Sequence, residues 1–281
     1  MRKEKDSLGT VEVPEEKFWG VQTQRSLHNF TISHETIPIE VVHALAMVKR
    51  AAAQINAEKG SLSKEKQSLI VSACDEVLSG AYNDHFPLSV WQTGSGTQTN
   101  MNVNEVVANI AAHSQGRPLG AKDPIHPNDD VNKSQSSNDI FPTAMHIATK
   151  IKIEKELIPV LEAFEKTLAK KVEAFKGIVK IGRTHLMDAV PLTLGQEFSA
   201  FHEQICKARL RVMASLDELG QLPIGGTAVG TGLNAPDGFS EAVAQEVSAF
   251  SGVSFTPAPN RFEMIGSEDA SVQVSSALKG L

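Results

Sequence analysis

The sequence predicts a mainly α-helical protein in which long helices form a bundle, and three observations support this fold class. Aromatic residues make up only 5% of the 281 residues, while residues with high helix propensity are abundant, which favours helices over a β-sandwich. Hydrophobic residues make up 41% and charged residues 21%, enough apolar surface for a packed core. Two long segments in the second half carry apolar residues every three or four positions, the pattern of amphipathic helices.

The first half of the chain contains three segments with helical character. A helix is expected over Ile39–Lys59 and should end at Gly60. A second is expected from Ser63 to about Leu78, because serine is a favourable N-cap and Glu65 places a negative charge in the first turn. Residues 103–113 form a shorter stretch that is also helical in type.

Two periodic stripes define the expected long helices. The first consists of Leu157, Leu161, Phe164, Leu168, Val172 and Phe175, and the second of Leu194, Phe198, Phe201, Ile205, Ala208, Val212, Leu216 and Leu219. Each helix is expected to run about 25–30 residues, roughly 40–45 Å, with one buried face. Pro142 is expected near the start of the first helix and Pro159 at a kink. Helices of this length suit a bundle, often an oligomeric one.

The domain division follows from the position of these helices. We expect a small N-terminal domain over residues 1–135 and a central helical-bundle domain over residues 136–281. Residues 267–281 are typical of a helix still in progress, since no glycine cap followed by a helix breaker is present. The bundle domain is therefore expected to be incomplete and the chain to be a fragment.

Charge and cysteine content exclude several classes of protein. Lys plus Arg total 27 and Asp plus Glu total 33, a net charge of −6, which argues against binding to nucleic acids or to membrane surfaces. Cys74 and Cys206 are too few for a disulfide framework or a four-cysteine metal site. The N-terminus lacks the apolar region of a signal peptide, and no apolar run approaches 18 residues. A cytoplasmic protein without a membrane partner is expected.

Three polar segments rich in Gly, Ser and Asn interrupt the helices, at residues 93–100, 126–138 and 225–234. In the first, glycines at 94 and 96 allow backbone N–H groups to approach a ligand closely, and the loop leads into a helix. A helix N-terminus favours a carboxylate or a phosphate. The alternative is a tight turn between domains.

The second segment repeats this pattern before the long helix. One of Ser136, Ser137 and Asn138 is expected to cap that helix, but capping accounts for only one of the three residues. Two such segments on one chain suit a small dianion that is bound mainly by uncharged donors.

Two histidines are candidates for chemistry. His185 follows Thr184 and precedes Asp188, so its pKa could be tuned across neutrality for acid–base catalysis; the alternative is a structural histidine. His126 lies beside Asn128 and Asp129, but the cluster has no metal-ligand spacing. No metal is expected.

Four motifs in this order resemble class II fumarate hydratase, the iron-independent branch of the aspartase/fumarase superfamily. They are WQTGSGTQTNMNVNEV at 91–106, HPNDDVNKSQSSND at 126–139, KIGRTHLMDAVPLTLGQE at 180–197 and GGTAVGTGLN at 225–234. The resemblance runs from about Lys5 to the last residue and fits an N-terminal portion. It implies an aspartase/fumarase-like fold that stops before the C-terminal domain, and a homotetramer with active sites shared between subunits. It also implies reversible hydration of fumarate to L-malate in the tricarboxylic acid cycle, without a cofactor.

The resemblance also assigns roles to residues of this sequence. It implies that Ser95, Gly96 and Thr97 hold a substrate carboxylate, that Ser136, Ser137 and Asn138 contact substrate from a neighbouring subunit, that Thr184 and the catalytic His185 belong to the reaction centre, and that His126, Asn128 and Asp129 form a second dicarboxylate site. The family's serine loop, which carries the general base, would lie after Leu281, so the chain by itself is expected to be nearly inactive.

The sequence departs from the family in two further positions. Asp123 stands where family members often carry arginine, and Met187 stands where they usually carry glutamine. Two alternatives to the fumarase interpretation remain open: an aspartate ammonia-lyase, and a non-catalytic helical scaffold.

Overall fold

The computed structural model describes residues 1–281 and is mainly α-helical, as the sequence predicts. Contacts within the chain divide it into two units: unit 1 comprises Met1–Ala148 with Gly220–Glu268, and unit 2 comprises Thr149–Leu219 with Asp269–Leu281. The expected domain boundary at residue 135 stays a prediction. No helix is sufficiently long and apolar to cross a membrane.

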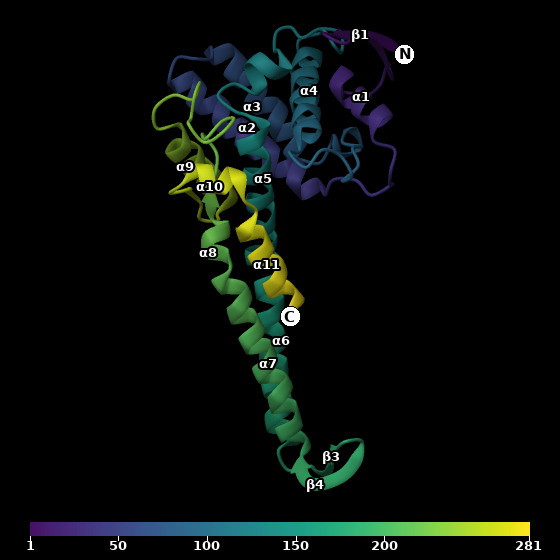
Figure 1. The fold of residues 1–281 in the computed structure, drawn as a ribbon, viewed down its shortest axis with the longest axis vertical. Helices are drawn as coiled ribbons and strands as arrows, with labels where there is room; N and C mark the ends of the chain where they lie inside the picture. The colour runs from purple at the N-terminus through teal and green to yellow at the C-terminus, as the bar shows by residue number, and fades with distance from the viewer. The chain divides into compact units, whose positions relative to one another are not determined.

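Unit 1 combines a helical core with short two-stranded sheets (Figure 1). Its elements are β1 (Arg2–Asp6), β2 (Gly9–Val13), α1 (Val21–Asn29), α2 (Ile39–Glu58), α3 (Lys64–Leu78), a 3₁₀ turn (Asn83–His85), α4 (Thr97–Ser114), a π-helical turn (Pro127–Val131), most of α5 (Ser137–Lys152), β5 (Gln221–Leu222), α9 (Phe239–Ser251), β6 (Thr256–Pro257) and α10 (Arg261–Gly266). Strands β1 and β2 are antiparallel, whereas β5 and β6 are parallel.

The helices expected in the first half are confirmed. Helix α3 begins directly after Ser63, whose hydroxyl accepts a hydrogen bond from the Lys66 amide at 3.3 Å. Helix α4 is longer than the stretch expected over 103–113, because it begins at Thr97. The added turn is polar in sequence, yet Asn100 and Asn102 are fully buried and make hydrogen bonds inside the protein. Periodicity of apolar residues alone does not detect such a turn.

A buried carboxylate holds the start of α1. Glu105 of α4 is 4% exposed, and its two oxygens accept hydrogen bonds from the amides of Gly20, Gln22 and Thr23 at 2.7–3.1 Å. These are the amides at a helix N-terminus that lack partners within the helix. A side chain 82 or more residues away in sequence therefore replaces the local N-cap, which α1 does not have.

Unit 2 is built on a helical hairpin. After the last residues of α5, it contains a π-helical turn (Ile153–Leu157), α6 (Ile158–Phe175), β3 (Val179–Thr184), β4 (Met187–Thr193), α7 (Leu194–Ala214), α8 (Leu216–Leu219) and α11 (Asp269–Lys279). Helices α6 and α7 lie side by side, and the antiparallel pair β3–β4 connects them (Figure 1). No pattern in the sequence predicted this strand pair.

The two prolines take different places in the long helical segment. Pro142 lies inside α5, so its expected position at the helix start is wrong. Pro159 lies in the first turn of α6 directly after the π-helical turn, where its missing N–H is tolerated.

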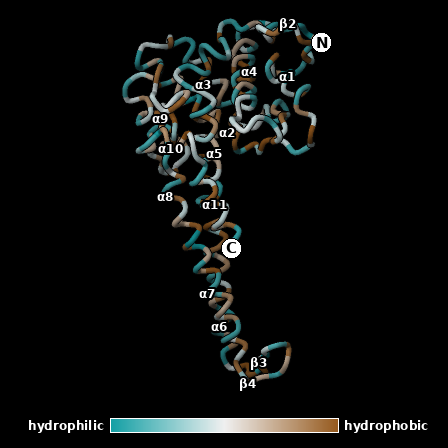
Figure 2. Tube along the Cα trace, in the orientation of Figure 1, coloured by the Kyte–Doolittle hydropathy of each residue, from teal (hydrophilic) through white to brown (hydrophobic).

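The two apolar stripes are only partly buried within unit 2. Leu161 and Leu168 are buried, but Phe164 and Phe201 are each 46% exposed. Hydrophilic and hydrophobic residues alternate along α6 and α7 (Figure 2). Within a single chain, each of these helices has one principal neighbour in unit 2, and that neighbour covers only part of the stripe. Burial of the whole stripe in an assembled bundle stays a prediction.

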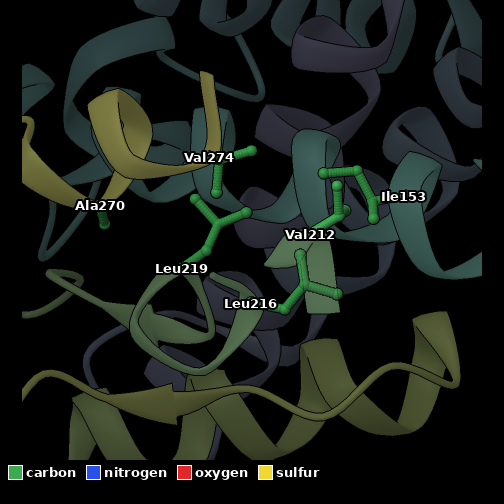
Figure 3. Packing of buried hydrophobic residues seen from close by; sticks show 6 residues of the cluster. All are labelled: Ile153, Val212, Leu216, Leu219, Ala270 and Val274. Atoms are coloured by element: carbon green, nitrogen blue, oxygen red, sulfur yellow. The ribbon is translucent and has the colours of Figure 1, made fainter. Parts of the chain in front are cut away.

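A small hydrophobic cluster lies in unit 2 around the end of α7 and the short helix α8. Figure 3 shows its six buried members, Ile153, Val212, Leu216, Leu219, Ala270 and Val274. They come from the π-helical turn, α7, α8 and α11, so the cluster attaches the last helix of the chain to the hairpin.

Two valines on α11 provide a matched test of this cluster. Val274 is 2% exposed and belongs to the cluster, whereas Val272 is 61% exposed. Val274→Ala is expected to lower the free energy of unfolding of unit 2 by about 2 kcal/mol, through lost burial and the cavity left behind. Val272→Ala is expected to change it by less than about 0.5 kcal/mol. Urea denaturation of both variants measures the difference, and equal effects would contradict the packing described.

Candidate functional site

The glycine-rich loop leads directly into α4, as the sequence predicts. Gly96 occupies the N-cap position with φ +65°, a left-handed conformation that favours glycine. The hydroxyls of Thr93 and Thr97 each lie 3.1 Å from the Ser95 hydroxyl, and all three residues are exposed. The loop therefore presents a group of neutral donors beside a helix N-terminus, where the helix dipole favours an anion.

The three polar residues Ser136, Ser137 and Asn138 at the start of α5 each make a different hydrogen bond. Ser136 is the capping residue, because its hydroxyl accepts a hydrogen bond from the Asn138 amide at 3.3 Å. Ser137 accepts a hydrogen bond from Asn100 Nδ2 at 3.0 Å, and Asn138 donates through Nδ2 to the carbonyl of Ala228 at 2.8 Å. Only one of the three residues is explained by capping.

Asp139 was not identified as a site residue from the sequence, yet it joins two of the polar segments. It is fully buried, and Oδ1 accepts a hydrogen bond from the Ser136 amide at 2.9 Å. Its Oδ2 accepts from the amides of Gly225 and Thr227 at 3.0 and 2.8 Å. Burial raises the pKa of this carboxyl to about 6, although the three N–H donors favour its charged form. The sequence signal that could have identified Asp139 is its position, third in the helix after a serine N-cap.

Three polar segments that are distant in sequence thus meet at the start of α5 in unit 1. Gly96 packs against the ring of Phe141, since a Cβ added at Gly96 would lie 2.1 Å from Phe141 Cγ. A cavity of about 350 Å³ is lined by residues of the second and third segments, Ser136 and Thr227 among them. The gathering of these loops is a finding of the structure.

A second buried charge lies beneath these loops. Lys49 of α2 is fully buried, and its Nζ donates to Asn100 Oδ1 at 2.7 Å and to Asn132 Oδ1 and Gln135 Oε1 at 3.3 Å. Desolvation lowers the pKa of this ammonium to about 7. In the sequence, Lys49 is one more charged residue within a helix, so no local pattern distinguished it.

The residues of the expected second dicarboxylate site lie together at the π-helical turn. His126 accepts at Nδ1 a hydrogen bond from the Asp129 amide at 3.1 Å, and Asn128 donates through Nδ2 to Asp129 Oδ1 at 3.1 Å. A cavity of about 250 Å³ is lined by His126, Asn128 and Lys122 among others. Asp123 is paired with Arg117 at 3.6 Å. The binding role of this group stays a prediction.

Thr184 and His185 belong to unit 2, not to the group of loops in unit 1. They lie where β3 turns into β4, whereas the sequence predicted only that they precede a long helix. His185 and Leu186 form the turn with φ of +49° and +64°, although neither is glycine. A turn with positive φ at both central residues normally carries Asn or Gly, and strain of this kind accumulates at functional positions.

The exposed polar groups of these loops in unit 1 are uncharged. The hydroxyls of Ser95 and Thr97 and the carboxamide of Asn138 are exposed groups that can donate hydrogen bonds to an anion. No group of three or more His, Cys, Asp or Glu residues is placed to hold a metal ion.

Comparison with known proteins gives one matching family. The family model described as "Lyase" matches residues 9–281. A class II fumarate hydratase of Myxococcus xanthus is 54% identical over 281 residues, and one of Yersinia pestis is 53% identical over 280 residues; the match covers 100% of this chain in both cases and 60% of each relative. The chain thus spans about 60% of the length of these curated relatives.

Solved structures agree with the sequence comparison. The class II fumarase of Schistosoma mansoni is 40% identical with a TM-score of 0.95, and the match covers 99% of this chain and 62% of that one. A protein of Brucella melitensis described as fumarate lyase:delta crystallin, bound to cobalt, is 39% identical with a TM-score of 0.93 over 99% of this chain and 61% of that one.

Proposed function

Because the chain belongs to the lyase family, we propose that it forms part of a class II fumarate hydratase, which converts fumarate and water reversibly into L-malate. One observation carries this proposal. The loop at Ser95–Thr97, the segment Ser136–Asn138 and the glycine loop held by Asp139 meet at the start of α5. They supply uncharged donors suited to a small dicarboxylate.

Each segment has a part in binding. The hydroxyls of Ser95 and Thr97 receive one carboxylate beside the N-terminus of α4, where the helix dipole adds a favourable charge. Ser137 and Asn138 bind the other part of the substrate, in an active site that adjacent subunits share. The group of His126, Asn128 and Asp129 acts as a second dicarboxylate site.

The reaction needs donors and an acid. Removing a proton alpha to a carboxylate creates a dianionic aci-carboxylate, which is stabilised by donors already aimed at its oxygens. Loss of the hydroxyl group as hydroxide needs a proton. We assign this proton transfer to His185, with Thr184 beside it.

The exposed surface of unit 2 is suited to assembly with other copies of the chain. Unit 2 exposes apolar side chains along its helices, including Val160, Phe164, Phe201, Leu210 and Met213, which are 42–64% exposed. Apolar surface of this kind supports burial against further copies of the chain. We propose a homotetramer that acts in the cytoplasm, within the tricarboxylic acid cycle.

Turnover of two substrates tests this function. The purified protein that contains this chain is expected to convert L-malate into fumarate, followed by ultraviolet absorbance, and to release no ammonia from L-aspartate. His185→Asn is expected to lower kcat about 100-fold or more with a small change in KM. His34→Asn, an exposed histidine outside the site, is the matched control and should retain full turnover.

The outcomes separate the alternatives. Ammonia release without malate turnover would identify an aspartate ammonia-lyase. Neither turnover nor binding of a four-carbon dicarboxylate would favour the non-catalytic scaffold.

A further inference from the structure

The buried Lys49 has a geometry that determines the direction of neighbouring hydrogen bonds. Three amide or carboxamide oxygens surround Nζ, those of Asn100, Asn132 and Gln135, at 2.7, 3.3 and 3.3 Å. An ammonium group has three N–H donors and no acceptor. Lys49 therefore matches its surroundings only when each of these side chains turns its oxygen toward it.

This constraint is passed on through Asn100. Because Oδ1 of Asn100 faces Lys49, Nδ2 faces the opposite way, toward Asn132 Oδ1 at 3.1 Å and Ser137 Oγ at 3.0 Å. Asn132 in turn donates through its own Nδ2 to the carbonyl of Gln135 at 3.3 Å. Every bond in this chain runs in one direction, away from the ammonium.

We propose that Lys49 is a positioning residue that sets the polarity of the hydrogen-bond chain Lys49–Asn100–Ser137, so that the Ser137 hydroxyl accepts from Asn100 and keeps its own proton for a bound carboxylate. The inference rests on the proposed function, which places a dicarboxylate at Ser137. Ser137 is partly exposed, so its hydroxyl proton has access to a ligand.

The reverse polarity explains why the charge matters. Without the ammonium, the Asn100 carboxamide is free to flip and to present its oxygen to Ser137. Ser137 would then donate its proton to the Asn100 oxygen and present only its oxygen lone pairs to the ligand. These lone pairs repel a carboxylate, so the ligand would bind more weakly. The effect on binding passes through two side chains, although Lys49 itself is fully buried.

Two titratable groups interact electrostatically with Lys49, in addition to its three hydrogen-bond acceptors. Asp139 favours the charged ammonium, and so does the Cys74 thiolate form, but burial raises the Cys74 pKa to about 12, so this thiol stays neutral. Burial lowers the pKa of Lys49 to about 7. Dicarboxylate affinity is therefore expected to decrease as the pH rises from 6 to 9, as the ammonium loses its proton.

A double-mutant cycle tests the proposal in the protein that contains this chain. Succinate, a non-reacting dicarboxylate, is titrated calorimetrically into wild type, Lys49→Met, Ser137→Ala and the double variant. Each single variant is expected to bind about 10-fold more weakly. The Kd of the double variant for succinate should be no more than about twice the larger of the two single-variant Kd values. The reason is that both changes remove the same donated bond. The decrease between pH 6 and 9 should be absent in Lys49→Met.

A second variant addresses the possibility that Lys49→Met does not fold. Asn100→Asp keeps oxygens toward Lys49 but removes the donor to Ser137, so it should bind succinate about 10-fold more weakly. It also removes the donor to Asn132 Oδ1, so its Tm is measured to confirm that the variant is folded. Asn109→Asp is the matched control on the same helix, since Asn109 is also buried but bonds only to Phe18 and Gly120. It should leave affinity unchanged.

The outcomes are distinguishable. A wild-type protein that does not bind succinate contradicts the proposed function itself. A wild type that binds, combined with additive effects of Lys49→Met and Ser137→Ala or with unchanged affinity of Asn100→Asp, overturns the polarity proposal and leaves the proposed function in place.

Discussion

Replacing Gly96 by alanine is expected to lower the free energy of unfolding by about 2–5 kcal/mol. The left-handed backbone at φ +65° costs a residue with a Cβ about 1–2 kcal/mol. The new Cβ would also lie 2.1–2.3 Å from three carbons of the Phe141 ring, and displacing a packed ring adds about 1–3 kcal/mol. Urea denaturation measures the sum. Binding of succinate should weaken as well, because the loop carries Ser95 and Thr97.

Gly94 provides the control for this substitution. It lies two residues earlier in the same loop, has no positive φ, and a Cβ added there would meet no atom within 4 Å. Gly94→Ala is expected to change stability by less than about 0.5 kcal/mol. Similar losses for both variants would mean that the loop does not pack on Phe141 as described.

Asp139→Asn is expected to lower the free energy of unfolding by about 1–3 kcal/mol, because the cheaper of its two orientations leaves one buried amide without an acceptor. One carboxylate oxygen accepts from two buried amides, those of Gly225 and Thr227. If the new NH₂ group replaces this oxygen, both amides lose their acceptor, at about 1–3 kcal/mol each. If the side chain flips, the Ser136 amide loses its acceptor instead. Asp123→Asn, at an exposed ion pair with Arg117, is the control and should change stability by about 0.5 kcal/mol or less.

The same variant predicts a pH effect with a definite sign. Burial raises the pKa of Asp139 from 3.8 to about 6 in the folded protein, so between these values the folded state binds more protons than the unfolded state. The stabilising contribution of this titration is present below pH 3.8 and is lost as the pH rises through about 6. The stability difference between wild type and Asp139→Asn should therefore narrow from pH 4 to pH 7. A difference that widens over this range would contradict the assignment.

Local sequence signals located most helices correctly because their causes are local. The Ser63 cap and the acidic first turn defined α3 within one residue, and Ile39–Glu58 follows the expected first helix closely. The strand pair β3–β4 escaped prediction because its turn uses His185 and Leu186 with positive φ. The sequence signal for such a turn is normally Asn-Gly or Asp-Gly.

The apolar stripes illustrate a different limit. Periodicity predicted α6 and α7, although they have 18 and 21 residues, shorter than the expected length. The exposure of Phe164 and Phe201 depends on how many neighbours each helix finds. A stripe records that a face is apolar, and not which surface covers it.

The sequence by itself determined the helical class, the helix start signals and the three polar segments with their candidate donors Ser95, Ser136, Ser137 and Asn138. Only the tertiary structure decided that these segments meet at the start of α5 and that Lys49 and Asp139 lie buried among them. The physical reason is that helix propensity and capping act over a few residues. The ionisation and hydrogen-bond direction of a buried charge depend on partners such as Asn100 and Thr227, which lie 51 and 88 positions away in the chain.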